Sequence, residues 1–72
     1  MDVGAAIAAM RDGKKVTRAG WNGPGQWIAL QVPDENSKMG KPYLYISPVD
    51  GQLVPWLASQ ADILASDWTV VE

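Results

Sequence analysis

The fold is decided by residues 26–32, Gln-Trp-Ile-Ala-Leu-Gln-Val. Successive side chains of a β-strand point to opposite faces of a sheet. This stretch therefore places Ile28, Leu30 and Val32 on one face and Trp27 on the other. The aliphatic face predicts an antiparallel sheet with one side packed against a hydrophobic core.

The element that covers this face is predicted at residues 2–12. Apolar side chains recur at positions 3, 6, 7 and 10, which is one face of a 3.6-residue helical repeat. Asp2 is suited to cap the start of this helix, and Gly13 is suited to end it in a left-handed conformation.

The other elements are short. Strands are expected at residues 15–18, 43–47, 53–54 and 68–71, with a glycine-rich turn at 20–25 and an exposed polar loop at 33–42. Ser59 and Asp62 have the spacing of a capping arrangement that opens a helix through Ala65. The prediction is one α+β domain over residues 1–72: a small antiparallel sheet with the N-terminal helix on one face and a short second helix before the last strand.

The size and composition limit what can stabilise this domain. A chain of 72 residues buries only about 60% of its unfolded surface. It contains no Cys and no His, which excludes disulfides, thiolate and imidazole chemistry and the common zinc sites. We expect no metal and no cofactor, and self-association is the stabilising device that remains.

The aromatic residues indicate where a second subunit would bind. Trp27, Tyr43 and Tyr45 are expected on the face opposite the aliphatic side chains, where the N-terminal helix cannot cover them. A second copy of the chain is one candidate cover. The alternative is that loop 33–42 or segment 57–65 folds over this face.

Charge and hydropathy exclude several classes of partner. The net charge of −2 gives no overall attraction to duplex nucleic acid. The longest uncharged apolar stretch is too short to span a membrane, and no signal peptide is apparent, so a cytoplasmic location is expected. An enzyme is not expected: Asp62 and Asp67 could form a carboxylate pair, but a helix cap and a turn residue explain them more simply.

The segment 18–25, Arg-Ala-Gly-Trp-Asn-Gly-Pro-Gly, has the chemistry of a nucleotide-binding loop. Glycines allow backbone amides to approach an anion. Arg18, with Lys14 or Lys15 near it, could bind phosphate. Trp21 offers a ring for base stacking and Asn22 an amide for hydrogen bonds. A glycine-rich hairpin with a buried tryptophan is the alternative.

The segment 54–62, Val-Pro-Trp-Leu-Ala-Ser-Gln-Ala-Asp, forms a second candidate. Here Trp56 follows a proline, and polar side chains gather at the start of the second helix. The alternative is that Trp56 belongs to the core and Ser59 is only a cap. Trp68, in an apolar strand, is expected in the core.

These two motifs occur together with Gly-Lys-Lys-Val at 13–16 and Ala-Ser-Asp-Trp at 65–68. The order of the four segments and the residues around them resemble the second type of Thoeris anti-defence protein. The resemblance runs the length of the chain and is weakest at 33–42. Members of that family are small phage and prophage proteins.

The resemblance implies a homo-oligomer, typically a tetramer, that sequesters cyclic nucleotide immune signals in the infected or lysogenic bacterial host. The ligands would be cyclic ADP-ribose isomers made from NAD by TIR-domain proteins, with cyclic di- or trinucleotides at a separate site in some members. Pockets would lie between subunits. The rival functions are an adaptor module that binds protein through its aromatic face and an enzyme that cleaves the same signal.

Carried over by matching positions, the resemblance implies a ligand site without catalytic or metal-binding residues. Trp21→Ala is expected to abolish binding and leave the oligomer folded. The implied ligand-binding residues are Arg18, Gly20, Trp21, Asn22, Tyr43, Trp56, Ser59, Gln60 and Asp62.

Overall fold

In the computed structural model, which describes residues 1–71, helix α1 spans Val3–Arg11. The carboxylate of Asp2 caps this helix by accepting a hydrogen bond from the amide of Ala5 at 2.9 Å. Gly13 follows the helix with φ of +88°, a conformation that glycine adopts without steric cost. The roles predicted for Asp2 and Gly13 are confirmed, and the helix is one residue shorter at each end than the expected range 2–12.

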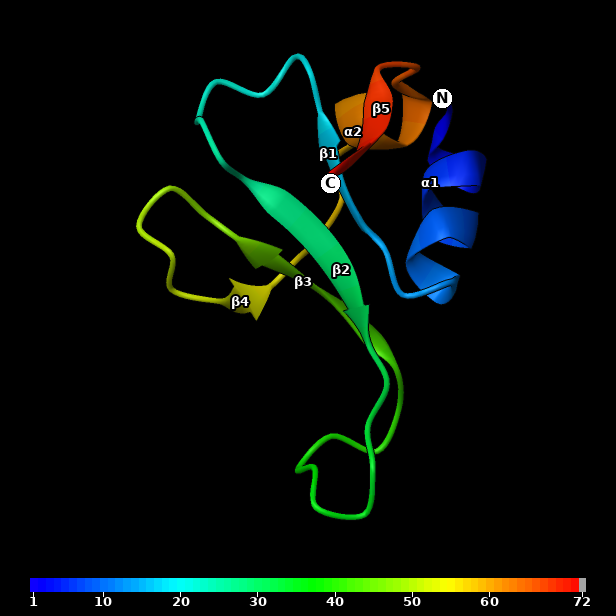
Figure 1. Cartoon of the computed structure of the whole chain (residues 1–72), viewed down its shortest axis with the longest axis vertical. Helices are drawn as coiled ribbons and strands as arrows, with labels where there is room; N and C mark the ends of the chain where they lie inside the picture. Colours follow the sequence, from blue (N-terminus) through cyan, green and yellow to red (C-terminus); the bar gives the residue numbers. More distant parts are fainter. Residues whose placement is uncertain (72) are drawn as a thin grey trace.

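The sheet contains five strands in the order β4-β3-β2-β1-β5, and every neighbouring pair is antiparallel (Figure 1). Helix α2 (Gln60–Leu64) lies between β4 and β5 in the chain. Neither helix within residues 1–71 has the length and apolar character needed to cross a membrane. The predicted α+β class is confirmed. The strands are β1 (Lys15–Arg18), β2 (Trp27–Gln31), β3 (Tyr43–Ser47), β4 (Val54–Pro55) and β5 (Trp68–Val71).

Two predicted strands differ from the observed ones by one residue at each end. Strand β2 ends at Gln31, and Val32 lies outside the sheet with 63% of its surface exposed, because Pro33 after it has no amide to continue the ladder. Strand β4 is Val54–Pro55 and excludes Leu53. Because β4 is an edge strand, it can accommodate Pro55, whose ring nitrogen donates no hydrogen bond.

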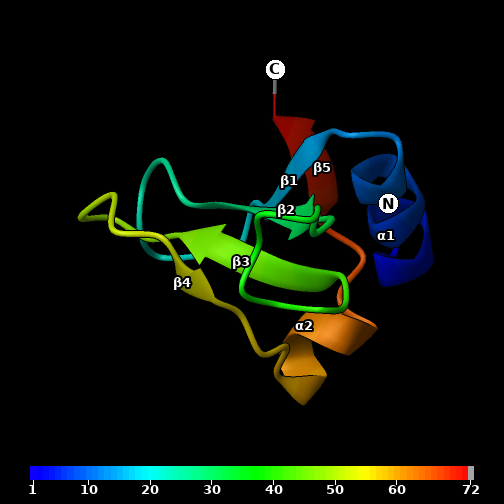
Figure 2. The same cartoon turned by 90° about the horizontal axis from the view of Figure 1, so that it is seen from below.

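The core lies between the sheet and the two helices, which are on the same side of it (Figure 2). Val16 pairs with Ile28 on β2, and both side chains are buried against Ala6 and Met10 of α1. Trp68 is 1% exposed and is the largest fully buried side chain. Its predicted place in the core is confirmed.

The opposite face of the sheet carries the aromatic residues expected there. Trp27 and Tyr45 meet edge to face, with ring centroids 5.9 Å apart. The ammonium of Lys15 lies 4.2 Å from the centroid of the Trp27 ring. Segment 57–65 is on the core side, and loop 33–42 extends beyond the ends of β2 and β3 (Figures 1 and 2). Neither segment covers the aromatic pair, so the second subunit stays a prediction.

Candidate binding site

Helix α2 begins with a capping box that fixes the direction of a carboxylate. The Ser59 hydroxyl accepts a hydrogen bond from the amide of Asp62 at 3.1 Å. In return, Oδ2 of Asp62 accepts from the Ser59 amide at 3.1 Å and from the Ser59 hydroxyl at 2.9 Å. The predicted capping arrangement is confirmed, and it turns the Asp62 side chain back toward the sheet.

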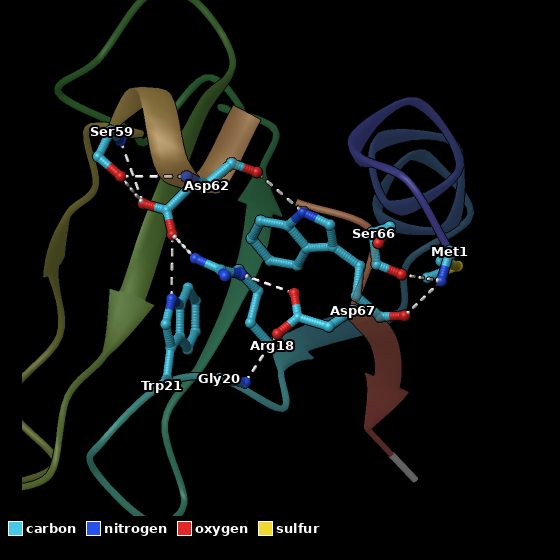
Figure 3. A network of polar contacts seen from close by, with 9 residues as sticks. Met1, Arg18, Gly20, Trp21, Ser59, Asp62, Ser66 and Asp67 are labelled. Carbon is cyan, nitrogen blue, oxygen red and sulfur yellow. Dashed lines mark hydrogen bonds and ion pairs between the residues drawn. The ribbon is translucent and has the colours of Figure 1, made fainter. Parts of the chain in front are cut away.

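The second oxygen of the same carboxylate binds the glycine-rich segment. Oδ1 of Asp62 accepts from Nη1 of Arg18 at 2.8 Å and from the indole Nε1 of Trp21 at 3.0 Å (Figure 3). Asp62 is 8% exposed. One buried carboxylate therefore receives four hydrogen bonds, which join the start of α2, the end of β1 and the turn that follows β1.

Asp67 holds the other side of the same arginine. Its Oδ1 accepts from Nε of Arg18 at 2.8 Å, and its Oδ2 accepts from the amide of Gly20 at 2.7 Å. A Cβ atom at position 20 would lie 2.9 Å from this Oδ2, so a residue without a side chain is needed for the approach. The amide expected to form an anion nest is thus bound to a carboxylate of the chain itself.

Arg18, Asp62 and Asp67 form what we call the Arg–Asp cluster. Burial by itself would raise the pKa of Asp62, but the hydrogen bonds from Arg18, Trp21 and Ser59 outweigh it and lower this pKa to about 2. The hydrogen bond from Arg18 likewise lowers the pKa of Asp67, and the bonds to Asp67 and Asp62 raise the pKa of Arg18. At pH 7 the cluster carries two negative charges and one positive charge.

This charge balance alters the expected phosphate site. Two of the three guanidinium nitrogens of Arg18 are bonded to carboxylates, and Nη2 makes no hydrogen bond within residues 1–71. Lys15 lies on the opposite face of the sheet, over Trp27, and Lys14 precedes the far end of β1. Alternation along the strand therefore separates Lys15 from Arg18, and Lys14 lies four residues from Arg18 at the other end of β1, so neither lysine is placed beside its guanidinium.

Three tryptophans pack beside the Arg–Asp cluster. Trp21 meets Trp68 edge to face at a centroid distance of 5.5 Å, and Trp56 meets Trp68 at 6.1 Å. Trp21 and Trp56, which we call the tryptophan pair, are 6.2 Å apart with ring planes inclined at 60°. Both are half-buried, so each ring contacts the core on one side and keeps part of its surface exposed.

The remaining predicted site residues divide into two groups. Asn22 and Gln60 are exposed, and their side chains form no hydrogen bonds within residues 1–71. Asn22 follows Trp21 in the segment after β1, and Gln60 is the first residue of α2. Tyr43 pairs with Gln31 at the far end of β2. By this register Tyr43 shares the sheet face of Trp27 and Tyr45, and it also borders a groove of about 540 Å³ lined by Met10 and Leu30.

Asp67 was not predicted as a site residue, although the sequence offered it with Asp62 as a possible carboxylate pair. It was expected to be a turn residue, and its position immediately before β5 fits that expectation. Its partners lie 47 and 49 positions earlier in the chain. Only the pairing of β1 with β5 brings them together, and no local sequence pattern signals that pairing.

Comparison with known proteins shows which family has a similar sequence. The model of the Thoeris anti-defense 2-like domain matches residues 1–71. The protein Thoeris anti-defense 2 of Bacillus phage SP01 is 29% identical over 84 aligned residues, which cover 99% of this chain and 94% of the phage protein. The similarity therefore extends over nearly the whole length of both sequences.

Proposed function

The chain belongs to the Thoeris anti-defense 2-like family, and we propose that it sequesters a cyclic nucleotide immune signal without altering it chemically. The proposed ligands are cyclic ADP-ribose isomers, with cyclic di- or trinucleotides as further candidates. The observation that carries this proposal is the tryptophan pair, held in place by the Arg–Asp cluster.

The tryptophan pair supports nucleotide binding because its rings are both accessible and fixed. The hydrogen bond from the Trp21 indole to Asp62 holds one edge of that ring, and Trp68 supports one side of each ring. Stacking a base on such a ring contributes about 1–3 kcal/mol. Since the planes are inclined at 60°, a base on one ring would meet the other ring at its edge.

We divide the predicted site residues by role. Asn22 and Gln60 have unused amide groups and would bind the bases or ribose hydroxyls directly. Arg18 would reach a ligand only through Nη2, because its other two nitrogens bind carboxylates. Gly20, Ser59 and Asp62 would hold the rings in position through their hydrogen bonds within the chain.

A site shared between subunits is consistent with this arrangement. The tryptophan pair lies on the surface of one protomer, and Tyr43 lies at the far end of the sheet. Tyr43 would contact the same ligand only when a second copy brings it there. We propose a homo-oligomer, with four copies as the expected number, in the cytoplasm of the bacterial host.

The character of the polar groups supports sequestration over catalysis. The chain has no His and no Cys. Asp62 and Asp67 are ionised at pH 7, and the hydrogen bonds from Arg18 lower both pKa values further from the working pH that a general acid needs. A ligand that binds between protomers would also stabilise the assembly by mass action.

One experiment separates sequestration from its rivals. The protein is mixed with the cyclic ADP-ribose isomers that a TIR-domain enzyme makes from NAD, and separately with cyclic di-AMP. Thermal unfolding is recorded, and the nucleotide released by denaturation is identified by mass spectrometry. A higher unfolding temperature with intact nucleotide supports the proposal. Degraded nucleotide indicates an enzyme, and no shift with either probe favours a protein-binding adaptor.

Variants at the surface test the assignment of the site. Asn22→Ala should weaken binding about tenfold, the loss expected for one well-made hydrogen bond with a ligand. Asn36→Ala in loop 33–42 is the matched control, because it removes another exposed amide. Trp21→Ala is expected to abolish binding while sedimentation and circular dichroism remain those of the folded oligomer. If the Trp21→Ala protein is unfolded, Trp21 is a core residue and its assignment to the ligand site is wrong.

A further inference from the structure

Asp67 is placed to control the turn that carries Trp21. The turn at residues 18–21 closes with a hydrogen bond from the Trp21 amide to the carbonyl of Arg18 at 3.2 Å. Asp67 binds this turn at three points: its carbonyl accepts from the Ala19 amide at 3.3 Å, and its carboxylate accepts from Gly20 and Arg18. The conformation of the turn therefore depends on one residue just before β5.

From this geometry we infer that Asp67 is a positioning residue for the ligand site, which orients Trp21 against Trp56 before a ligand binds. The part of this inference that concerns ligand binding rests on the proposed function. Its structural part, the orientation of Trp21, concerns the free protein. A site oriented in advance loses less conformational entropy when its ligand binds.

The chemistry of the contact requires an aspartate. Both carboxylate oxygens act as acceptors, one for Nε of Arg18 and one for the Gly20 amide. Asparagine has one acceptor oxygen, so its NH₂ group would face one of these two donors. Gly20→Ala perturbs the same contact from the other side, because the added Cβ would lie 2.9 Å from Oδ2.

Partial exposure separates this role from that of a core residue. The Asp67 side chain is 33% exposed, against 12% for Asp62. Ion pairs that water reaches contribute little to stability. We therefore expect changes at Asp67 to alter the geometry of Trp21 more than they alter the folding equilibrium.

The first arm of the test uses the protein without ligand. Near-ultraviolet circular dichroism is sensitive to the relative orientation of neighbouring tryptophan rings, and Asp67→Asn should change this spectrum. Asp67→Asn introduced into the Trp21→Phe variant should change the spectrum much less, because the indole ring of Trp21, whose orientation is being observed, is absent. Asp12→Asn, which removes one charge at the exposed end of α1, is the matched control and should match the wild type.

The second arm measures binding of the mixed cyclic ADP-ribose isomers by calorimetry. Asp67→Asn should weaken binding about tenfold, the loss associated with one hydrogen bond to a charged group. The effects of Asp67→Asn and Trp21→Phe should be non-additive, since both act through the same ring. Gly20→Ala should reproduce the spectral change and the weaker binding.

The outcomes distinguish this inference from the proposed function. An unchanged near-ultraviolet spectrum in both Asp67→Asn and Gly20→Ala overturns the positioning role, whatever the ligand. Wild-type protein that binds neither probe overturns the proposed function and leaves the spectral arm to decide the role of Asp67. If Asp67→Asn unfolds, Gly20→Ala decides, since it keeps the carboxylate and displaces it. Additive losses in the binding arm also count against the inference.

Discussion

Asp62→Asn should destabilise the protein through the cluster that joins three segments. The carboxylate accepts hydrogen bonds from Arg18, Trp21 and twice from Ser59, and all four partners are donors. An asparagine offers one acceptor oxygen, so its NH₂ group must face one pair of these donors. The favoured orientation keeps the oxygen toward Arg18 and Trp21 and gives up the cap on the Ser59 amide.

The size of the effect follows from the pKa and the cap. Lowering the pKa of Asp62 from 3.8 to about 2 corresponds to roughly 2 kcal/mol, which we reduce to about 1–2 kcal/mol because the cluster lies near solvent. The hydrogen bonds from Ser59 are among the causes of this lowered pKa, so the lost cap is already included. The free energy of unfolding should therefore fall by about 1–2 kcal/mol at pH 7, or roughly 5–15 °C in Tm for a domain of this size.

The same pKa fixes the pH dependence. A carboxylate whose pKa is lower in the folded protein than in the unfolded chain stabilises the folded state at pH values above the pKa of the unfolded chain. This stabilisation is lost as the pH falls through the pKa of the folded protein. The difference between wild type and Asp62→Asn should thus be constant above about pH 4 and shrink toward pH 2, because the variant has no carboxylate at 62 to protonate.

Urea unfolding followed by tryptophan fluorescence measures this difference, at one protomer concentration because association would affect the midpoint. Asp50→Asn is the matched control: Asp50 is an exposed turn residue that accepts one hydrogen bond, from the Gln52 amide. A loss below 1 kcal/mol at pH 7, or a difference that does not shrink between pH 4 and pH 2, would refute the role given to Asp62.

Three further substitutions test the fold. Trp68→Phe should cost about 2–4 kcal/mol in urea unfolding, because it opens a cavity and leaves the Asp62 carbonyl without its indole partner; a loss under 1 kcal/mol contradicts the assigned core. Gly13→Ala should cost about 1–2 kcal/mol through strain alone, since nothing lies within 4 Å of the added Cβ, and an unchanged Tm argues against the positive φ. Lys15→Gln should cost about 0.5–1 kcal/mol through its contact with the Trp27 ring, whereas Lys38→Gln should cost nothing measurable.

The sequence predicts those parts of the fold that depend on neighbouring residues. The helical repeat before Gly13, the alternation after Trp27 and the spacing of Ser59 and Asp62 are local patterns, and all three are confirmed. The limits at Val32 and Leu53 were missed because they depend on prolines and on the partner strand. The pairing of β1 with β5 joins residues 15 and 71, and no local pattern predicts it.

The candidate site shows the same division. Segments 18–25 and 54–62 were each recognised from their tryptophan and polar residues. The sequence could not indicate that Arg18 and Asp62 bind each other, because hydrogen-bonding capacity reveals no partner. Five of the nine residues expected to hold a ligand form hydrogen bonds within the chain through their side chain or, for Gly20, through the backbone amide. The exposed parts of the tryptophan pair and the side-chain amides of Asn22 and Gln60 remain open to a ligand.

The single carboxylate of Asp62 also determines how the protein opens. Helix α2 has five residues and is too short to be stable alone. If it unwound while the rest stayed folded, Arg18 and the Trp21 indole would both lose a partner. Partial opening is therefore costly, and the hydrogen-bonded amides of Asp62 and Ile63 should exchange with solvent about as slowly as those of β1. We therefore expect the shorter helix and strand β1 to open as one cooperative unit.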